Sequence, residues 1–194
     1  KERRKLFLDI ETSPNLVTSL RVGNKINIPA EAIVKERAII CISYKWSDED
    51  KVTSIAWNKG DDKDLLIEFS KIIESADEIV TQNGDRFDVK WIRTRCMFHD
   101  IPFPIKFNSI DTLKLAKASF YLNSNRLDYM GKFLGVGQKN HTSYELWSKI
   151  IFNNDKQALQ EMMDYCNQDV LLLEEVYNKF KKYCPTKRFK YIDR

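Results

Sequence analysis

The segment that most constrains the fold is residues 4–11, RKLFLDIE, in which apolar and polar side chains alternate. This period of two predicts a β-strand with two different faces. One face carries Leu6, Leu8 and Ile10, and the other carries Phe7, Asp9 and Glu11. Because a strand this apolar is expected inside a sheet, two acids on one face cost free energy unless a cation or a partner neutralises them.

The rest of the chain predicts an α/β fold. After a polar segment at 12–37, the expected elements are strands at 38–46 and 51–57 joined by a turn at 47–50, a helix at 61–76, a strand at 78–83, a helix at 87–99, an extended link or edge strand at 101–107, and helices at 111–121, 126–134 and 155–183. The first three strands are expected to be antiparallel, whereas the helix before the fourth implies a crossover to a parallel strand. We therefore expect a mixed β-sheet flanked by α-helices, with a helical C-terminal half.

Length and composition favour one globular domain over residues 1–194. The chain has 43% hydrophobic and 31% charged residues, and a chain of this length buries enough surface to fold without disulfides or a structural metal. No apolar stretch approaches the ~18 residues of a membrane helix, and no signal peptide is recognisable. The cysteines lack CxxC spacing, so we expect buried free thiols. These features favour a cytoplasmic protein.

The net charge leaves the partner open. The 32 Lys and Arg residues exceed the 28 Asp and Glu residues by only 4, and a near-balanced total can hide both a basic patch and an acidic metal site. His99 and His141 have no partner at ligand spacing and are expected at the surface. Trp46, Trp57 and Trp91 lie in apolar runs and are expected in the core.

Four acids and one phenol stand where a site could form. Asp9 and Glu11 leave the same strand face and could share a cation, or form an exposed polar face. Asp88 opens a helix, where it suits either the helix N-terminus or a ligand above a neighbouring strand end. Tyr165 and Asp169 lie four apart on the last helix and share one face, an arrangement also common at surfaces.

The chemistry of such a set points to hard cations. Oxygen ligands select Mg²⁺ or Mn²⁺ over zinc, and two such ions ~4 Å apart can clamp the attacking and leaving oxygens of a phosphodiester. Without metal the four acids would repel one another strongly. We therefore expect activity to depend on a divalent ion.

Three motifs in order, FLDIET, NGDRFD and YCNQD, resemble motifs I, II and III of the DnaQ-like (DEDD) 3′–5′ exonucleases, which have an RNase H-like fold. Tyr165, four residues before Asp169, is typical of the tyrosine-bearing DEDDy branch, which includes the proofreading domains of family A and B DNA polymerases. The histidine branch would have His at 164, where this chain has Asp164. Across nearly its whole length the chain is also similar to stand-alone phage and prophage exonucleases, which implies the cytoplasm of a bacterium or of a phage-infected host.

The resemblance implies roles for the acids and the phenol. Two Mg²⁺ or Mn²⁺ ions are held by Asp9, Glu11, Asp88 and Asp169, with Asp9 contacting both. Tyr165 orients the water that attacks the terminal phosphodiester. A phenol with an ordinary pKa of about 10 is a poor base at neutral pH, which favours orientation over proton abstraction.

Further residues are candidates for substrate contact. The candidate substrate-binding residues are Asn83, Phe87, Lys114, Lys117, Phe120 and Arg126. The cations among them would bind phosphates or else form a solvated helix face. Phe120 could stack on a terminal base. Asp111, before a helix, is expected first as an N-cap.

These features together predict a 3′–5′ exonuclease that acts on single-stranded nucleic acid, DNA in preference to RNA, and releases nucleoside monophosphates. An RNA-directed exo- or endoribonuclease of the same fold is the alternative within enzymes. A catalytically silent nucleic-acid-binding module is the alternative from another class. Since one nuclease domain fills the 194 residues, we expect processivity or targeting to come from a replication or recombination partner in trans, or from sequence that precedes Lys1.

Overall fold

The computed structural model describes residues 3–139 and 142–184, and its centre is a five-stranded mixed sheet. The strand order is β5-β4-β1-β6-β7, with β1 at Lys5–Thr12, β4 at Ile39–Trp46, β5 at Val52–Ala56, β6 at Glu78–Thr81 and β7 at Asn108–Asp111. Strands β1, β4 and β5 pair antiparallel, whereas β6 runs parallel to both β1 and β7. The expected mixed sheet is confirmed, with the acid-bearing strand in the middle.

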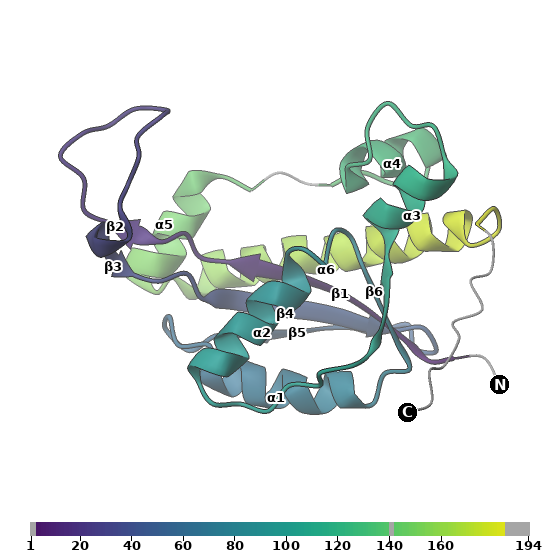
Figure 1. Ribbon diagram of the computed structural model, residues 1–194, viewed down its shortest axis with the longest axis horizontal. Coiled ribbons are helices and arrows are strands. Elements are labelled where there is room, and N and C mark those ends of the chain that lie inside the picture. Colours follow the sequence, from purple (N-terminus) through teal and green to yellow (C-terminus); the bar gives the residue numbers. More distant parts are fainter. Residues whose placement is uncertain (1–2, 140–141, 185–194) are drawn as a thin grey trace.

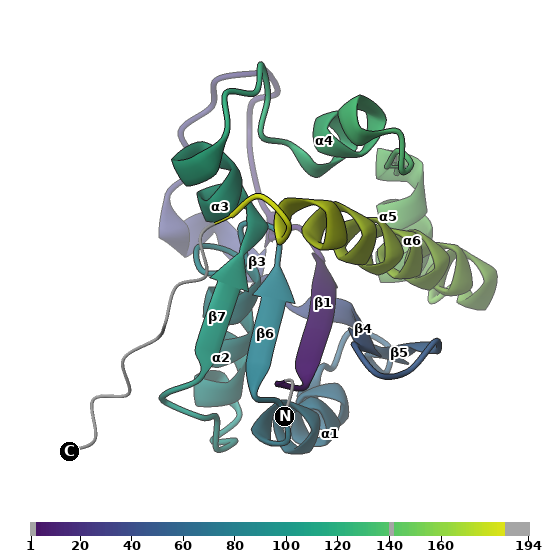
Figure 2. The ribbon, with the colours of Figure 1, turned by 90° about the vertical axis from the view of Figure 1, so that its right-hand side faces the viewer.

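Helices cover both faces of this sheet (Figures 1 and 2). Helices α1, Lys63–Glu74, and α2, Asp88–Phe98, pack on the face of β1 that carries Leu6, Leu8 and Ile10. The long helix α6, Lys156–Phe180, packs on the opposite face, where Phe7 meets Tyr177 edge to face. Asp9 and Glu11 share this second face, so the alternation in β1 aims both acids toward α6.

The remaining helices each contact α6. They are α3, Thr112–Ser119, α4, Leu127–Leu134, and α5, Tyr144–Asn153. Asp111 caps α3 by accepting from the Leu113 N–H, as the sequence predicted, and Asp155 caps α6 through the N–H groups of Gln157 and Ala158. In the described residues, no helix is long and apolar enough to cross a membrane.

Three elements differ from the expectations. Helix α5 was not predicted, because it is a short amphipathic helix of ten residues that lies between polar segments. The edge strand is β7 rather than 101–107. The four residues of β7 have only one apolar side chain, Ile110, so their sequence shows no strand pattern, and they form a strand by pairing with β6. The segment 12–37 contains a small ribbon of β2, Leu16–Val17, and β3, Ile33–Lys35, beside a 3₁₀ turn at Ala30–Ala32, and its loop projects from the body (Figure 1).

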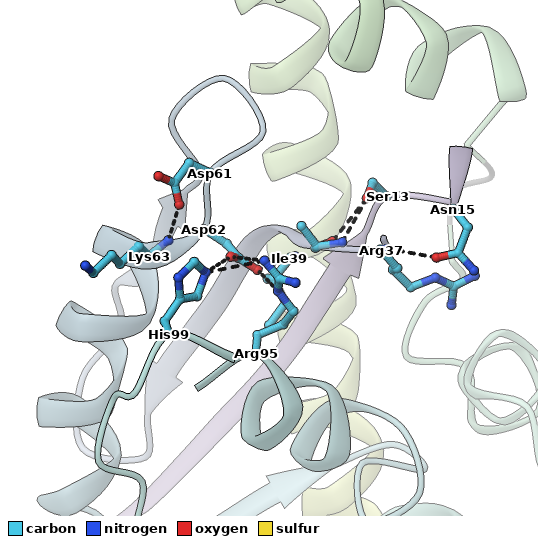
Figure 3. A network of polar contacts seen from close by, with 10 residues as sticks. Ser13, Asn15, Arg37, Ile39, Asp61, Asp62, Lys63, Arg95 and His99 are labelled. Atoms are coloured by element: carbon cyan, nitrogen blue, oxygen red, sulfur yellow. Dashed lines mark hydrogen bonds and ion pairs between the residues drawn. The ribbon is translucent and has the colours of Figure 1, made fainter. Parts of the chain in front are cut away.

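A buried polar cluster fastens α1, α2 and β4 to one another (Figure 3). The carboxylate of Asp62, whose side chain is 0% exposed, accepts from the Ile39 N–H at 2.9 Å and from Arg95 at 2.8 and 2.9 Å. Nε2 of His99 lies 2.7 Å from the same carboxylate. Burial would raise the pKa of Asp62, but the hydrogen bonds from Arg95, Ile39 and His99 hold that pKa below its ordinary value.

The expectation that His99 is a surface residue is therefore wrong. Its imidazole is 13% exposed and contacts Asp62, a contact that depends on how α2 packs on α1 and that spacing in the sequence does not reveal. His141 lies outside the described residues. Trp46 and Trp57 are buried, as expected, and Trp91 is half-buried. Of the free thiols, Cys41, Cys96 and Cys166 are buried and Cys184 is half-buried.

Candidate active site

The carboxylates of Asp9, Glu11 and Asp169 form one cluster. Each offers an oxygen within 4.8 Å of the others, although two come from β1 and the third from α6. Asp169 is buried because α6 lies directly on the sheet, where its side chain is 3% exposed. The sequence singled out these three residues, and the fold brings them together.

Asp88 lies beside the C-terminal half of β1 and comes from α2, on the face of the sheet opposite to α6. The parallel ladder between β1 and β6 ends at Phe7 and Val80, so the Ile10 N–H has no partner on β6. The carboxylate of Asp88, at the start of α2, accepts that N–H at 3.2 Å and is buried. Asp88 therefore lies beside the cluster without belonging to the three mutually close acids.

The electrostatics of the cluster are those of a site that requires positive charge. Burial raises the pKa of Asp9 well above its ordinary value, and the neighbouring Asp88, Asp169 and Glu11 raise that pKa further. Burial likewise raises the pKa of Glu11 to about 7. For Asp88, burial raises the pKa to about 7 even though its main-chain N–H and that of Ile10 act in the opposite direction.

A lysine that sequence reasoning missed supplies part of that positive charge. The ammonium of Lys139, between α4 and α5, forms an ion pair with Asp169, and its main-chain N–H donates to Asp128 at 3.0 Å. Burial would lower the pKa of Lys139, but Asp9 and Asp169 raise that pKa above its ordinary value. One lysine among many in a polar loop carries no signal in the sequence, so only the fold reveals this contact.

Tyr165 precedes Asp169 by one turn of α6. Its hydroxyl donates to the carboxylate of Glu161 at 3.0 Å, one further turn back. In the described structure the hydroxyl forms no hydrogen bond with any of the four acids of the candidate site. The hydrogen bond to Glu161 raises the pKa of the Tyr165 phenol above its ordinary value. The phenol therefore stays protonated at neutral pH.

Cys166 lies next to the acid cluster, in contact with Asp9. Its Sγ lies 3.4 Å from both the main-chain oxygen and Oδ2 of Asp9, and the residue is completely buried. Burial and the neighbouring Cys41 raise the pKa of this thiol well above its ordinary value. Cys166 therefore remains a neutral, inert wall of the site rather than a nucleophile.

The candidate substrate-binding residues lie in varied surroundings. Asn83 has a left-handed backbone, φ 61°, and its N–H donates to Asp111 at 2.9 Å. Phe87 packs against the core at the start of α2. Lys114 pairs with Asp85, and the ring of Phe120 lies 4.8 Å from that of Phe180. Lys117 and Arg126 are exposed.

The mixed sheet, the helices on both faces and the acids at the end of the central strand define an RNase H-like nuclease domain. The chain belongs to the RNase H superfamily, since the sequence profile of that superfamily matches residues 30–181. A search of curated protein sequences finds no match.

Solved structures show the same fold. The family B DNA polymerase from the hyperthermophilic archaeon Pyrobaculum calidifontis is similar with a TM-score of 0.69 and 17% sequence identity. The similarity covers 93% of this chain and 25% of the polymerase chain, so this chain spans about a quarter of that protein's length.

Proposed function

We propose that this protein is a divalent-metal-dependent 3′–5′ exonuclease that releases nucleoside monophosphates from single-stranded nucleic acid, DNA in preference to RNA. The observation that carries the proposal is the cluster of the half-buried Asp9 and Glu11 with the buried Asp169, and the buried Asp88 beside it. The 3′–5′ direction is supported by the order of the three motifs and by the tyrosine one turn before Asp169.

The residues present fit hard divalent cations. All four acids offer carboxylate oxygens, and burial raises the pKa values of Asp9, Glu11 and Asp88, so a bound cation would favour their charged forms. Mg²⁺ or Mn²⁺, as two ions held by Asp9, Glu11, Asp88 and Asp169, would supply Lewis-acid stabilisation of the phosphodiester oxygens and activate water.

Within this proposal, Tyr165 orients the attacking water. Its phenol sits on the same helix as Asp169, and the hydrogen bond to Glu161 fixes the ring while keeping the hydroxyl protonated. Because the phenol O–H is donated to Glu161, its oxygen can accept a hydrogen bond from the water and so orient it, while the protonated phenol does not take the proton of the water. Orientation is thus the role that its surroundings favour.

Lys139 balances the negative charge of the cluster. Its ammonium pairs with Asp169, and Asp9 and Glu11 contribute to its raised pKa. A cation held at this position can attract the phosphate of an approaching strand end and compensate the acids when fewer ions are bound.

A digestion panel tests the proposal. Single- and double-stranded DNA and RNA, each labelled at the 3′ or the 5′ end, are incubated with Mg²⁺, with Mn²⁺ and with a chelator. We expect mononucleotides from the 3′ end of single strands, most rapidly from DNA, and no release with the chelator. Internal fragments would show an endonuclease instead. Binding that survives in Asp9→Ala, without release by the unsubstituted protein, would show a binding module.

A further inference from the structure

A cavity of about 450 Å³ lies beside the candidate active site, between α2, the segment before β7 and the first turn of α3. We name it the α2–β7 cavity. Its polar lining consists of Asp85, Arg93, Lys106 and Lys114, and Phe107 is among its apolar walls. Figure 2 shows the elements that contribute its lining: β7 is the edge strand, α2 lies behind it and α3 follows it directly.

The surface around this cavity is strongly basic. Lys90 and Arg93 lie three residues apart on α2, Arg86 lies in the turn before this helix, and all three are exposed. Lys106 and the two lysines of α3, Lys114 and Lys117, are exposed as well.

Most of this positive charge is not compensated. Lys114 pairs with Asp85 at 2.5 Å, and Asp85 also accepts from Ser109 at 2.5 Å. In the portion of the chain that the structure describes, none of the other five cations forms an ion pair with a carboxylate. Such a concentration of unpaired cations around a cavity favours a ligand with repeated negative charges.

The cavity is connected to the candidate active site by one short loop, residues 82–87. Asp85 lines the cavity and Asp88 lies beside the acid cluster, and the two belong to the same turn. The buried carboxylate of Asp111 accepts from the N–H groups of Asn83, at 2.9 Å, and Asp85, at 3.4 Å. This loop is therefore fixed, and a strand whose end lies at the acids can pass over it to the cavity.

We infer that the α2–β7 cavity binds the sugar-phosphate backbone of the substrate strand, a few nucleotides upstream of the bond that is cleaved. The inference rests on the proposed function and adds a second contact region to it. Arg93 and Lys106 bind phosphates, while Phe107 provides an apolar wall against a sugar or base. An acidic protein segment has similar charge, but the direct connection to Asp88 favours the strand that the acids would cleave.

Two double variants of equal charge test the inference. Arg93→Ala/Lys106→Ala removes two cations of the cavity, and Lys63→Ala/Lys71→Ala removes two exposed cations of α1, away from it. Each is assayed on a strand of about 12 nucleotides and on the p-nitrophenyl ester of thymidine 5′-monophosphate, which is too short to reach the cavity. Lys106→Ala alone guards against a folding defect, because Arg93 also lies 5.9 Å from the Phe103 ring.

We expect the cavity variant to raise KM for the long strand at least about fivefold, with unchanged turnover of the nitrophenyl ester, and the α1 variant to match the unsubstituted protein. The slope of log Kd against log salt should fall by about 1.4, since each lost phosphate contact on a single strand removes ~0.7. An unchanged KM and slope, or an equal loss on both substrates, would overturn the inference.

A binding measurement separates this inference from the proposed function. Fluorescence anisotropy with a phosphorothioate strand needs no cleavage, so it reports on the cavity even when neither substrate is hydrolysed. Absence of hydrolysis together with weaker binding by the cavity variant would reject the proposed function and retain a strand-binding cavity. Equal binding by all variants would reject the cavity.

Discussion

The carboxylate of Asp88 on α2 accepts a hydrogen bond from the main-chain N–H of Ile10 on β1, at 3.2 Å. One oxygen of Asp88 thus satisfies a main-chain N–H of β1 beyond the last residue that pairs with β6. The negative charge of the same carboxylate also raises the pKa of Asp9 in the acid cluster. Asp88 therefore has a structural role and an electrostatic role, which different substitutions separate.

Asp88→Asn should lower nuclease turnover more than about a hundredfold while preserving the fold. The amide oxygen can still accept from Ile10, but the charge is lost. Asp88→Ala leaves that buried N–H unsatisfied and should lower the free energy of unfolding by about 1–3 kcal/mol as well. Urea unfolding and turnover are measured on both variants. Equal stability of the two would contradict the structural role, and activity of Asp88→Asn within tenfold of normal, on the order of 1.4 kcal/mol, would contradict the site.

Lys139→Gln should destabilise the metal-free protein at neutral pH. The ammonium compensates Asp9 and Asp169, but it is 41% exposed and screened by solvent, so the expected loss is only ~1 kcal/mol. Saturating Mn²⁺ should abolish the difference in Tm, because bound cations replace the missing charge. Lys132→Gln, in an exposed pair with Asp128, is the matched control and should change little. A difference that persists in Mn²⁺ would show that Lys139 acts through packing instead.

Tyr165→Phe should lower kcat by about tenfold or more and leave Kd for a blocked strand unchanged, since a lost water-orienting hydroxyl affects only the reaction. Glu161→Gln retains an acceptor for the phenol and should keep most of the activity. Single-turnover rates and strand binding are measured for each. A normal rate in Tyr165→Phe would assign water orientation to another group.

The thermal stability of the metal-free protein should fall as the pH rises from about 4 to about 7. In the folded state burial raises the pKa of Glu11 and of Asp88 to about 7, above the value of about 4 in an unfolded chain. Between these values the folded state binds more protons, so the free energy of unfolding from these groups decreases with pH. Glu11→Gln should reduce this dependence.

Divalent ions should reverse this loss. Because cations bind deprotonated carboxylates, Mg²⁺ or Mn²⁺ should raise Tm more at about pH 7.5 than at about pH 5.5. Calorimetry at both pH values, with and without each ion, measures the effect. An identical gain in Tm at the two values would argue against binding through these acids.

Asp62→Ala should lower the free energy of unfolding by about 3–5 kcal/mol, because it leaves the buried Arg95 guanidinium without its partner. The variant should have normal activity per folded molecule. Asp50→Ala, at an exposed turn, is the control and should change stability by less than about 0.5 kcal/mol. A loss of under about 1 kcal/mol in Asp62→Ala would mean that the cluster is not a structural anchor.

The alternation of apolar and polar residues predicted the strands and helices whose formation depends on neighbouring residues, but not the contacts between distant segments. Alternation in β1 was sufficient to place Asp9 and Glu11 on one strand face, and the apolar stripe of α6 to place Asp169 at its border, whereas the grouping of the three acids came from the resemblance to the exonuclease motifs. Strand β7 could not be predicted because its hydrogen bonds come from β6, and Lys139 could not because its contact with Asp169 joins a loop to a distant helix. Capping by Asp111 was predictable, but its bonds to Asn83 and Asp85 were not, since they depend on the path of another loop.

The acid cluster takes members from the first strand and from the last helix that the structure describes. A chain still emerging from the ribosome therefore cannot assemble the cluster until α6 has been made and has docked on the sheet. Synthesis thus delays the appearance of the complete acid set until most of the chain is folded. A proteolytic fragment that has lost α6 lacks both Tyr165 and Asp169, so it could not carry the complete acid cluster.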